Sequence, residues 1–184
     1  MTAALCHEAS FRDATAADIP VLLDLIAELA AYERLSDEAV ATHADLHDSL
    51  FGPAPRAHAL LAERDGGVAG MAVFFFSFST FTGRPSLYLE DVFVRPDHRG
   101  QGIGRGFFRL LAQRAVTERC GRMEWSVLDW NEPALDFYRA LGAEPRAGWT
   151  TMRLVRDGLA RVAESKAGLC PDPQRVRGPF DPLT

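Results

Sequence analysis

A glycine-dense turn is the part of this sequence whose residue types point most directly to chemistry. The run Val94-Arg-Pro-Asp-His-Arg99-Gly100-Gln-Gly102-Ile103-Gly104 follows an apolar stretch and precedes a segment with helical periodicity. Glycine lets the backbone approach a ligand closely, and the N–H groups at a helix start carry partial positive charge. Arg99 adds a guanidinium for charge-assisted hydrogen bonds. The turn therefore predicts a phosphate-binding site, and the alternative is a turn that binds no ligand.

Two common phosphate-binding motifs do not fit this turn. A P-loop ends in Gly-Lys-Ser/Thr, whereas Gly104 is followed by Arg105 and Gly106. A dinucleotide-binding G-x-G-x-x-G motif needs glycine at position 105 or 107, where the chain has Arg105 and Phe107. What remains is Arg-Gly-x-Gly-Ile-Gly after an apolar run that ends in Val-x-Pro.

Two adjacent acids, Glu90 and Asp91, stand in the middle of the apolar run at residues 87–94. A carboxylate in a half-buried strand is costly unless it has a partner or a function. We expect Glu90 to bind a substrate cation and accept its proton, and the alternative is an ion pair with an arginine. Side chains alternate between the faces of a strand, so Asp91 should point away from Glu90 unless a bulge intervenes. For Asp91 a functional and a structural role are equally open.

Hydrophobic periodicity predicts the elements that must position these groups. Helices are expected from Ile19 after the cap Thr15, from Thr42 to Gly52-Pro53, from the glycine turn to about residue 119, and over residues 133–141. Strands are expected over residues 57–63, 68–78, 87–94, 123–128 and 149–155, with Asp65-Gly66-Gly67 as a hairpin turn. This order is typical of a mixed α/β domain rather than a regular βαβ repeat.

The length and composition suit one globular domain. Of the 184 residues, 47% are hydrophobic and 24% are charged, which argues against disorder. The formal net charge of −5 disfavours nucleic acid as a partner and mildly favours a cationic ligand. We expect a domain over residues 1–166 and a Pro/Gly/Arg-rich tail over residues 167–184.

Neither a metal site nor a disulfide framework is expected. The cysteines Cys6, Cys120 and Cys170 are widely spaced, and His43 and His47 lack a third ligand. The N-terminus has no signal-peptide pattern, and no apolar run is long enough to span a membrane. A cytoplasmic location, without a membrane partner, is the expectation.

Several stretches resemble the GNAT (GCN5-related N-acetyltransferase) superfamily, and within it the spermidine/spermine (diamine) acetyltransferases. The resemblance covers about residues 11–163. It rests on the glycine turn and on Ala14-Thr-Ala-Ala-Asp18, Glu28-Leu-Ala-Ala-Tyr32-Glu33, Leu87-Tyr-Leu-Glu90-Asp91, Trp130-Asn131-Glu132-Pro133, Phe137-Tyr138-Arg139 and Gly142-Ala143.

The resemblance implies a GNAT fold, in which a mixed central sheet flanked by helices is splayed in a V around acetyl-CoA. It implies that the pantetheine arm pairs with the backbone of Val92, Phe93 and Val94. The pyrophosphate would bind over Arg99, Gly100, Gln101, Gly102, Ile103, Gly104 and Arg105, with Asn131, Pro133 and Ala134 contacting acetyl-CoA from the other side. A homodimer is a further implication.

The implied activity is direct transfer of acetyl to a primary amine of a small cationic metabolite, either a diamine or polyamine or a thialysine-like amino acid. The amine must lose a proton, the thioester carbonyl must be polarised, and the leaving thiolate benefits from a proton donor. Tyr138 matches the family's general acid, and Glu90 would be the base or substrate anchor. The implied substrate-binding residues are Tyr32, Glu33, Glu90, Asp91, Glu124, Trp125 and Ser126.

Two positions depart from the polyamine enzymes. Ser79 stands nearest to where they place an aspartate, and Ala147 stands where they have a glutamate that contacts substrate. The loss of two carboxylates weakens the case for a long polycation and fits a shorter diamine, a thialysine-like amino acid or another amine. Two other classes stay open, namely a protein or peptide N-acetyltransferase and a non-catalytic acyl-CoA-binding module.

Overall fold

The computed structural model describes residues 8–164, which form two compact units divided between Glu132 and Pro133. Cys6, His7, Cys170 and the predicted tail at 167–184 lie outside the described residues. The first unit contains β1 (Ser10–Asp13), α1 (Ile19–Glu33), α2 (His43–Phe51), β2 (His58–Arg64), β3 (Gly67–Ser79), β4 (Arg84–Val94), α3 (Ile103–Thr117) and β5 (Met123–Trp125). Short 3-10 turns lie at Ala16–Asp18, Ser36–Glu38 and Pro96–His98.

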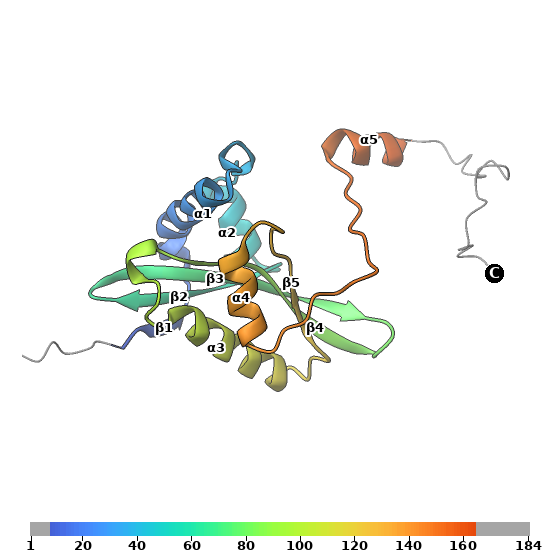
Figure 1. Ribbon diagram of the computed structural model, residues 1–184. Coiled ribbons are helices and arrows are strands. Elements are labelled where there is room, and N and C mark those ends of the chain that lie inside the picture. Colours follow the sequence, from blue (N-terminus) through green and yellow to red (C-terminus); the bar gives the residue numbers. More distant parts are fainter. Residues whose placement is uncertain (1–7, 165–184) are drawn as a thin grey trace, which may run out of the picture. The chain divides into compact units, whose positions relative to one another are not determined.

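The five strands form one mixed sheet in the order β1-β2-β3-β4-β5. All neighbours are antiparallel except β4 and β5, which run parallel. Asp65 and Gly66, with φ of 53° and 81°, make the predicted tight turn between β2 and β3. In Figure 1, α1 and α2 lie on one face of the sheet and α3 on the other. The predicted α/β fold with helices on both faces is confirmed.

The α1 face of the sheet carries a contiguous apolar core. Leu22 and Leu25 of α1 are fully buried, and they cluster with Leu61 of β2, Met71 of β3 and Phe93 of β4. Each such side chain contributes about 1.5–3 kcal/mol through its removal from water. This packing fixes α1 against the sheet, whose strand β4 carries the two adjacent acids.

The opposite face is covered by α3, whose buried side chains include Phe107 and Leu111. The rings of Phe11 and Phe107 meet edge to face at 5.2 Å. A Cβ on Gly106 would collide with the Phe11 ring, so the close approach of helix and sheet requires glycine at this position.

The sheet opens between β4 and β5. Only Leu87, Tyr88 and Leu89 pair with β5, whereas β4 continues to Val94. The N–H of Arg95 donates to Ala69 C=O, toward the β3 side. Because successive residues direct their backbone groups to opposite edges of a strand, Val94 and Val92 direct theirs toward the open side. The splayed V implied by the resemblance is therefore present in the described sheet.

The second unit contains α4 (Glu132–Ala140), whose first residue ends the first unit, and α5 (Arg156–Glu164). Pro133 near the start of α4 and Gly142 after its end, at φ 85°, match the predicted helix limits.

Four elements differ from the sequence-based expectation. Residues 149–155 form no strand, and β5 stops at Trp125 instead of residue 128. Neither β1 nor α5 was predicted from the sequence. A strand exists only where a neighbouring edge completes its ladder, and no such partner is described for residues 149–155. The four residues of β1 are too few for a periodic signal.

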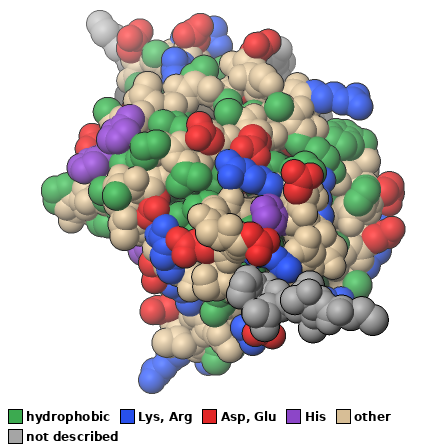
Figure 2. Space-filling view, turned by 90° about the vertical axis from the view of Figure 1, so that its left-hand side faces the viewer, with side chains coloured by type: hydrophobic (Ala, Val, Ile, Leu, Met, Phe, Trp, Pro, Cys, Tyr) green, Lys and Arg blue, Asp and Glu red, His purple; other side chains and the backbone are tan. Residues whose placement is uncertain are grey.

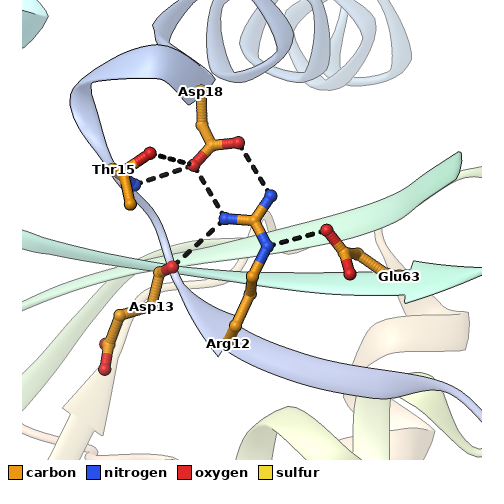
Figure 3. A network of polar contacts seen from close by, with 5 residues as sticks. All are labelled: Arg12, Asp13, Thr15, Asp18 and Glu63. Carbon is orange, nitrogen blue, oxygen red and sulfur yellow. Dashed lines mark hydrogen bonds and ion pairs between the residues drawn. The ribbon is translucent and has the colours of Figure 1, made fainter.

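Three ionisable side chains fasten β1 to β2 and to the start of α1 (Figure 3). Arg12 donates two hydrogen bonds to the Asp18 carboxylate, at 2.7 and 2.8 Å, and one to Glu63 at 2.7 Å. Asp18 also accepts from the N–H and hydroxyl of Thr15, both at 2.8 Å. The Arg12 guanidinium holds the pKa of Asp18 well below its usual range.

Asp18→Asn should destabilise the protein by about 1–2 kcal/mol at pH 7, a modest value because Arg12 is partly solvent-screened. Since the folded-state pKa of Asp18 is depressed, its stabilisation is present above the unfolded-state pKa near 4 and is lost as pH falls. Urea unfolding at pH 7, 4 and 3 should therefore show that the difference in the free energy of unfolding between wild type and Asp18→Asn becomes smaller as the pH falls. The control is Asp48→Asn, because the Asp48 side chain is 85% exposed. Equal losses in both variants would contradict this role.

Acidic and basic side chains are interspersed with hydrophobic ones on the face drawn in Figure 2. None of the helices between residues 8 and 164 is long and apolar enough to cross a membrane. Within the same residues, no three His, Cys, Asp or Glu side chains are arranged so that they could hold a metal ion together.

Candidate active site

A β-bulge in β4 places Glu90 and Asp91 in different surroundings. Val73 of β3 pairs with Asp91 and Phe74 pairs with Leu89, so Glu90 has no partner in the register. Directly opposite residues share a face of the sheet. Val73 packs against the core under α1, which places Asp91 on the α1 face, whereas Glu90 is exposed at the bulge. The bulge foreseen as an exception thus decides which acid is partly buried.

The surroundings of Asp91 shift the pKa of its carboxyl group. Burial, together with the negative charges of Glu90 and Glu33, raises the pKa of Asp91 to about 6. Burial also raises the pKa of Glu33, the last residue of α1. The negative charges of Glu33 and Glu90 therefore both act on Asp91. Such a cluster holds negative charge at unfavourable cost unless a cation neutralises it.

The predicted glycine turn has the expected local form. Gly100 and Gly102 have φ of 72° and 83°, and no atom lies within 4 Å of a Cβ built on either. Helix α3 begins at Ile103, so its first N–H groups follow directly after Gly102. The Ile103 side chain is buried, which leaves its backbone as the part able to meet a ligand.

Two polar side chains of the turn donate hydrogen bonds to nearby backbone carbonyls. Gln101 donates to the carbonyl of Asp97 at 3.1 Å, which ties the turn to itself. Arg99 donates through Nε to the carbonyl of Val94 at 2.9 Å. Its guanidinium lies 4.9 Å from the ring centre of Tyr32 and 5.7 Å from that of Phe93. The predicted residues Tyr32, Phe93, Val94 and Arg99 therefore come together in one contact group.

Asn131 joins the same group from the segment after β5. It is buried, and its Oδ1 accepts a hydrogen bond from the Tyr32 hydroxyl at 3.1 Å. The neighbouring Trp130 ring is 6.0 Å from that of Tyr32, and Arg34 lies 5.6 Å over Trp130. The sequence did not lead us to assign Arg34 or Trp130 to the site, although Trp130 directly precedes Asn131 in the matching Trp-Asn-Glu-Pro motif.

The predicted residues at β5 have partners within the first unit. Glu124 pairs with Arg122 at 2.7 Å, and Trp125 meets Phe108 edge to face at 5.1 Å. Ser126 and the hydroxyl of Tyr88 are 2.9 Å apart, which connects the two strands where they diverge. Tyr88 was not assigned to the site from the sequence, and the bulge places it on the same face of the sheet as Asp91.

Three predicted residues lie on α4: Pro133, Ala134 and Tyr138. The Tyr138 ring is 5.5 Å from that of Phe137, and its carbonyl accepts from the N–H of Leu141 and Ala143 at the helix end. These contacts describe α4 by itself, because it belongs to the second unit.

Comparisons with known proteins agree with this geometry. The model of the acetyltransferase (GNAT) family matches residues 24–143. Thialysine N-epsilon-acetyltransferase of Bos taurus is 37% identical over 163 residues, which cover 83% of this chain and 95% of the bovine protein. The spermidine/spermine N(1)-acetyltransferase-like protein 1 of Homo sapiens is 36% identical over 83% of this chain and 23% of its own length. An integron cassette protein from the V. cholerae mobile metagenome superposes with a TM-score of 0.72 at 27% identity, over 85% of this chain and 98% of that one.

A sheet that opens beside its fourth strand, with a glycine turn leading into a helix, is the arrangement that the resemblance to the acetyltransferases implies. The chain belongs to the GNAT family and is an acetyltransferase. The resemblance recognised in the sequence is thereby confirmed at the level of the family, its fold and its enzyme class.

Proposed function

We propose that this acetyltransferase transfers acetyl from acetyl-CoA to the terminal primary amine of a small cationic metabolite, such as a thialysine-like amino acid or a short diamine. The observation that carries the proposal is the partly buried Asp91 of β4, on which the negative charges of Glu90 and of Glu33 at the end of α1 act. An alkylammonium group would neutralise this cluster, which makes a cationic substrate favourable where a neutral one is not. The family relatives named for thialysine and for spermidine/spermine support the same substrate class.

Two features of the first unit support the binding of a CoA thioester. Val92 and Val94 direct backbone groups to the open side of β4, where the pantetheine amides would find hydrogen-bond partners. The open space before Gly100 and Gly102 and the start of α3 suit a pyrophosphate. We assign Gln101, Gly104, Arg105, Asn131, Pro133 and Ala134 to the same ligand on the strength of the sequence match.

Acetyl-CoA, as co-substrate, supplies the thioester carbonyl carbon that the amine attacks. At neutral pH an alkylamine with a pKa near 10.4 arrives protonated, so it must lose a proton before it can attack the thioester. Asp91 suits the role of proton acceptor because a pKa of about 6 lies near the working pH. Glu90, exposed beside Asp91, suits the other role expected for it, that of an anchor for the substrate cation. Tyr138 would donate a proton to the leaving sulfur.

A short substrate fits this chain better than a long polycation. Ser79, which stands where the polyamine enzymes have an aspartate, is buried and carries no charge. Ala147 likewise offers no carboxylate for a distal ammonium. Tyr32, Glu33, Glu124, Trp125 and Ser126 complete the set of residues that we propose to line the amine site.

The test is a free-thiol release assay with acetyl-CoA and a panel of amines: putrescine, spermidine, spermine, lysine, thialysine and a lysine-containing peptide. We expect thialysine or putrescine to give the highest kcat/KM, and spermine to be at least about tenfold poorer, since each missing ion pair removes roughly 1 kcal/mol or more. Turnover of the peptide alone would favour a protein acetyltransferase. Binding of CoA without turnover of any amine would favour a non-catalytic module.

A further inference from the structure

We propose that Tyr32 is a positioning residue: its contacts fix the orientation of the Arg99 and Asn131 side chains on the CoA-binding side of the site. This inference rests on the proposed function for one point only, namely that the glycine turn binds CoA. The resemblance implies that Tyr32 lines the amine site, whereas its contacts point toward the turn. Tyr32 immediately precedes Glu33 at the end of α1. This helix end therefore carries one side chain for the CoA side of the site and one for the amine side.

The guanidinium of Arg99 is constrained on three sides. Its Nε donates to the Val94 carbonyl at 2.9 Å, and the rings of Tyr32 and Phe93 lie 4.9 and 5.7 Å from its central carbon. Stacking on an aromatic face and one fixed hydrogen bond leave a guanidinium few orientations. The Nη groups, which make no hydrogen bond with the described residues, are then presented in one direction beside the turn.

The hydroxyl of Tyr32 acts on a second group. It donates to Oδ1 of the buried Asn131, which immediately precedes α4. A side-chain amide whose oxygen is fixed in this way has its NH₂ direction fixed as well. The ring of Tyr32 and its hydroxyl therefore orient two polar groups that come from different segments of the first unit.

This arrangement separates a positioning role from a substrate-lining role. A tyrosine that only lined the amine site would change the KM for the amine when replaced and would leave the affinity for CoA unchanged. A tyrosine that orients Arg99 and Asn131 changes the affinity for CoA even when no amine is present. Its two contacts are also separable, since phenylalanine keeps the ring and loses only the hydroxyl.

The experiment measures the Kd of CoA by calorimetry, without amine, for wild type, Tyr32→Phe, Tyr32→Leu and Arg99→Lys. We expect about a two- to fivefold weaker Kd for Tyr32→Phe and about tenfold for Tyr32→Leu, from the loss of one hydrogen bond and then of the stacking. Tyr32→Leu combined with Arg99→Lys should be clearly less than additive, because both changes break the same contact. The matched control is Phe81→Leu, which removes a ring that is 93% exposed in the β3–β4 turn.

The outcomes distinguish the two levels of inference. If wild type binds CoA and Tyr32→Leu binds it equally well, the positioning role is wrong while the proposed function stands. If the losses in the double variant simply add, Tyr32 and Arg99 act independently and the inference is also wrong. If wild type does not bind CoA at all, the proposed function fails, and the inference falls with it.

Discussion

Tyr138→Phe should lower kcat for the preferred amine by about 10²–10⁴-fold while leaving the Kd of CoA within about twofold, because general acid catalysis contributes that range and phenylalanine retains the ring. The loss should appear equally in kcat and in kcat/KM, since the proton is given to the sulfur only as the thioester breaks. Steady-state thiol release, with calorimetry for CoA binding, measures both quantities.

The control for Tyr138 uses the leaving group itself. An acetyl thioester of a more acidic thiol needs less help from a proton donor, so its turnover should suffer less from the substitution than that of acetyl-CoA. An unchanged kcat would show that Tyr138 is an ordinary helix residue beside Phe137. A large rise in the Kd of CoA would instead assign Tyr138 to binding.

Asp91→Asn should lower kcat/KM for the amine by about 10²–10³-fold and at the same time stabilise the protein above pH 6. The activity falls because an amide replaces the carboxylate of Asp91, whose pKa of about 6 lies near the working pH. Wild type should lose activity as pH falls through about 6, when Asp91 takes up its proton. The residual activity of the variant should lack that acidic limb.

The effect of Asp91 on stability has the opposite sign to its effect on activity. The folded-state pKa lies above the unfolded-state value of 3.8, so folded Asp91 binds more protons than unfolded Asp91 between these limits. Stability therefore declines as pH rises through this window, and the full cost is present above pH 6. Asp91→Asn should gain on the order of 2 kcal/mol at pH 8 and almost nothing at pH 4.

Glu90→Gln is the matched control, because Glu90 is adjacent, carries the same charge and is exposed. We expect it to raise the KM of the amine by about tenfold or less and to change stability little, consistent with an anchor at the bulge. Thermal unfolding at pH 4 and pH 8 and kcat/KM profiles from pH 4.5 to 9 decide between the acids. A loss of the acidic limb in Glu90→Gln but not in Asp91→Asn would exchange their roles.

Local physical chemistry made much of the first unit predictable. Helices α1 and α2 follow from apolar spacing and caps, and the β2–β3 turn follows from residues that tolerate positive φ. The glycine turn is equally local, because Gly100 and Gly102 are needed wherever the backbone takes this path. These features belong to a few consecutive residues, so the sequence alone determines them.

Only the tertiary structure decided the arrangement of the candidate site. The bulge at Glu90 depends on the register that β3 imposes on β4, and it gives the buried position to Asp91 instead of Glu90. The contacts of Tyr32 with Arg99 and Asn131 join residues far apart in the sequence. Strand register and long-range contact arise from the packing of the whole unit, and no short window of sequence contains them.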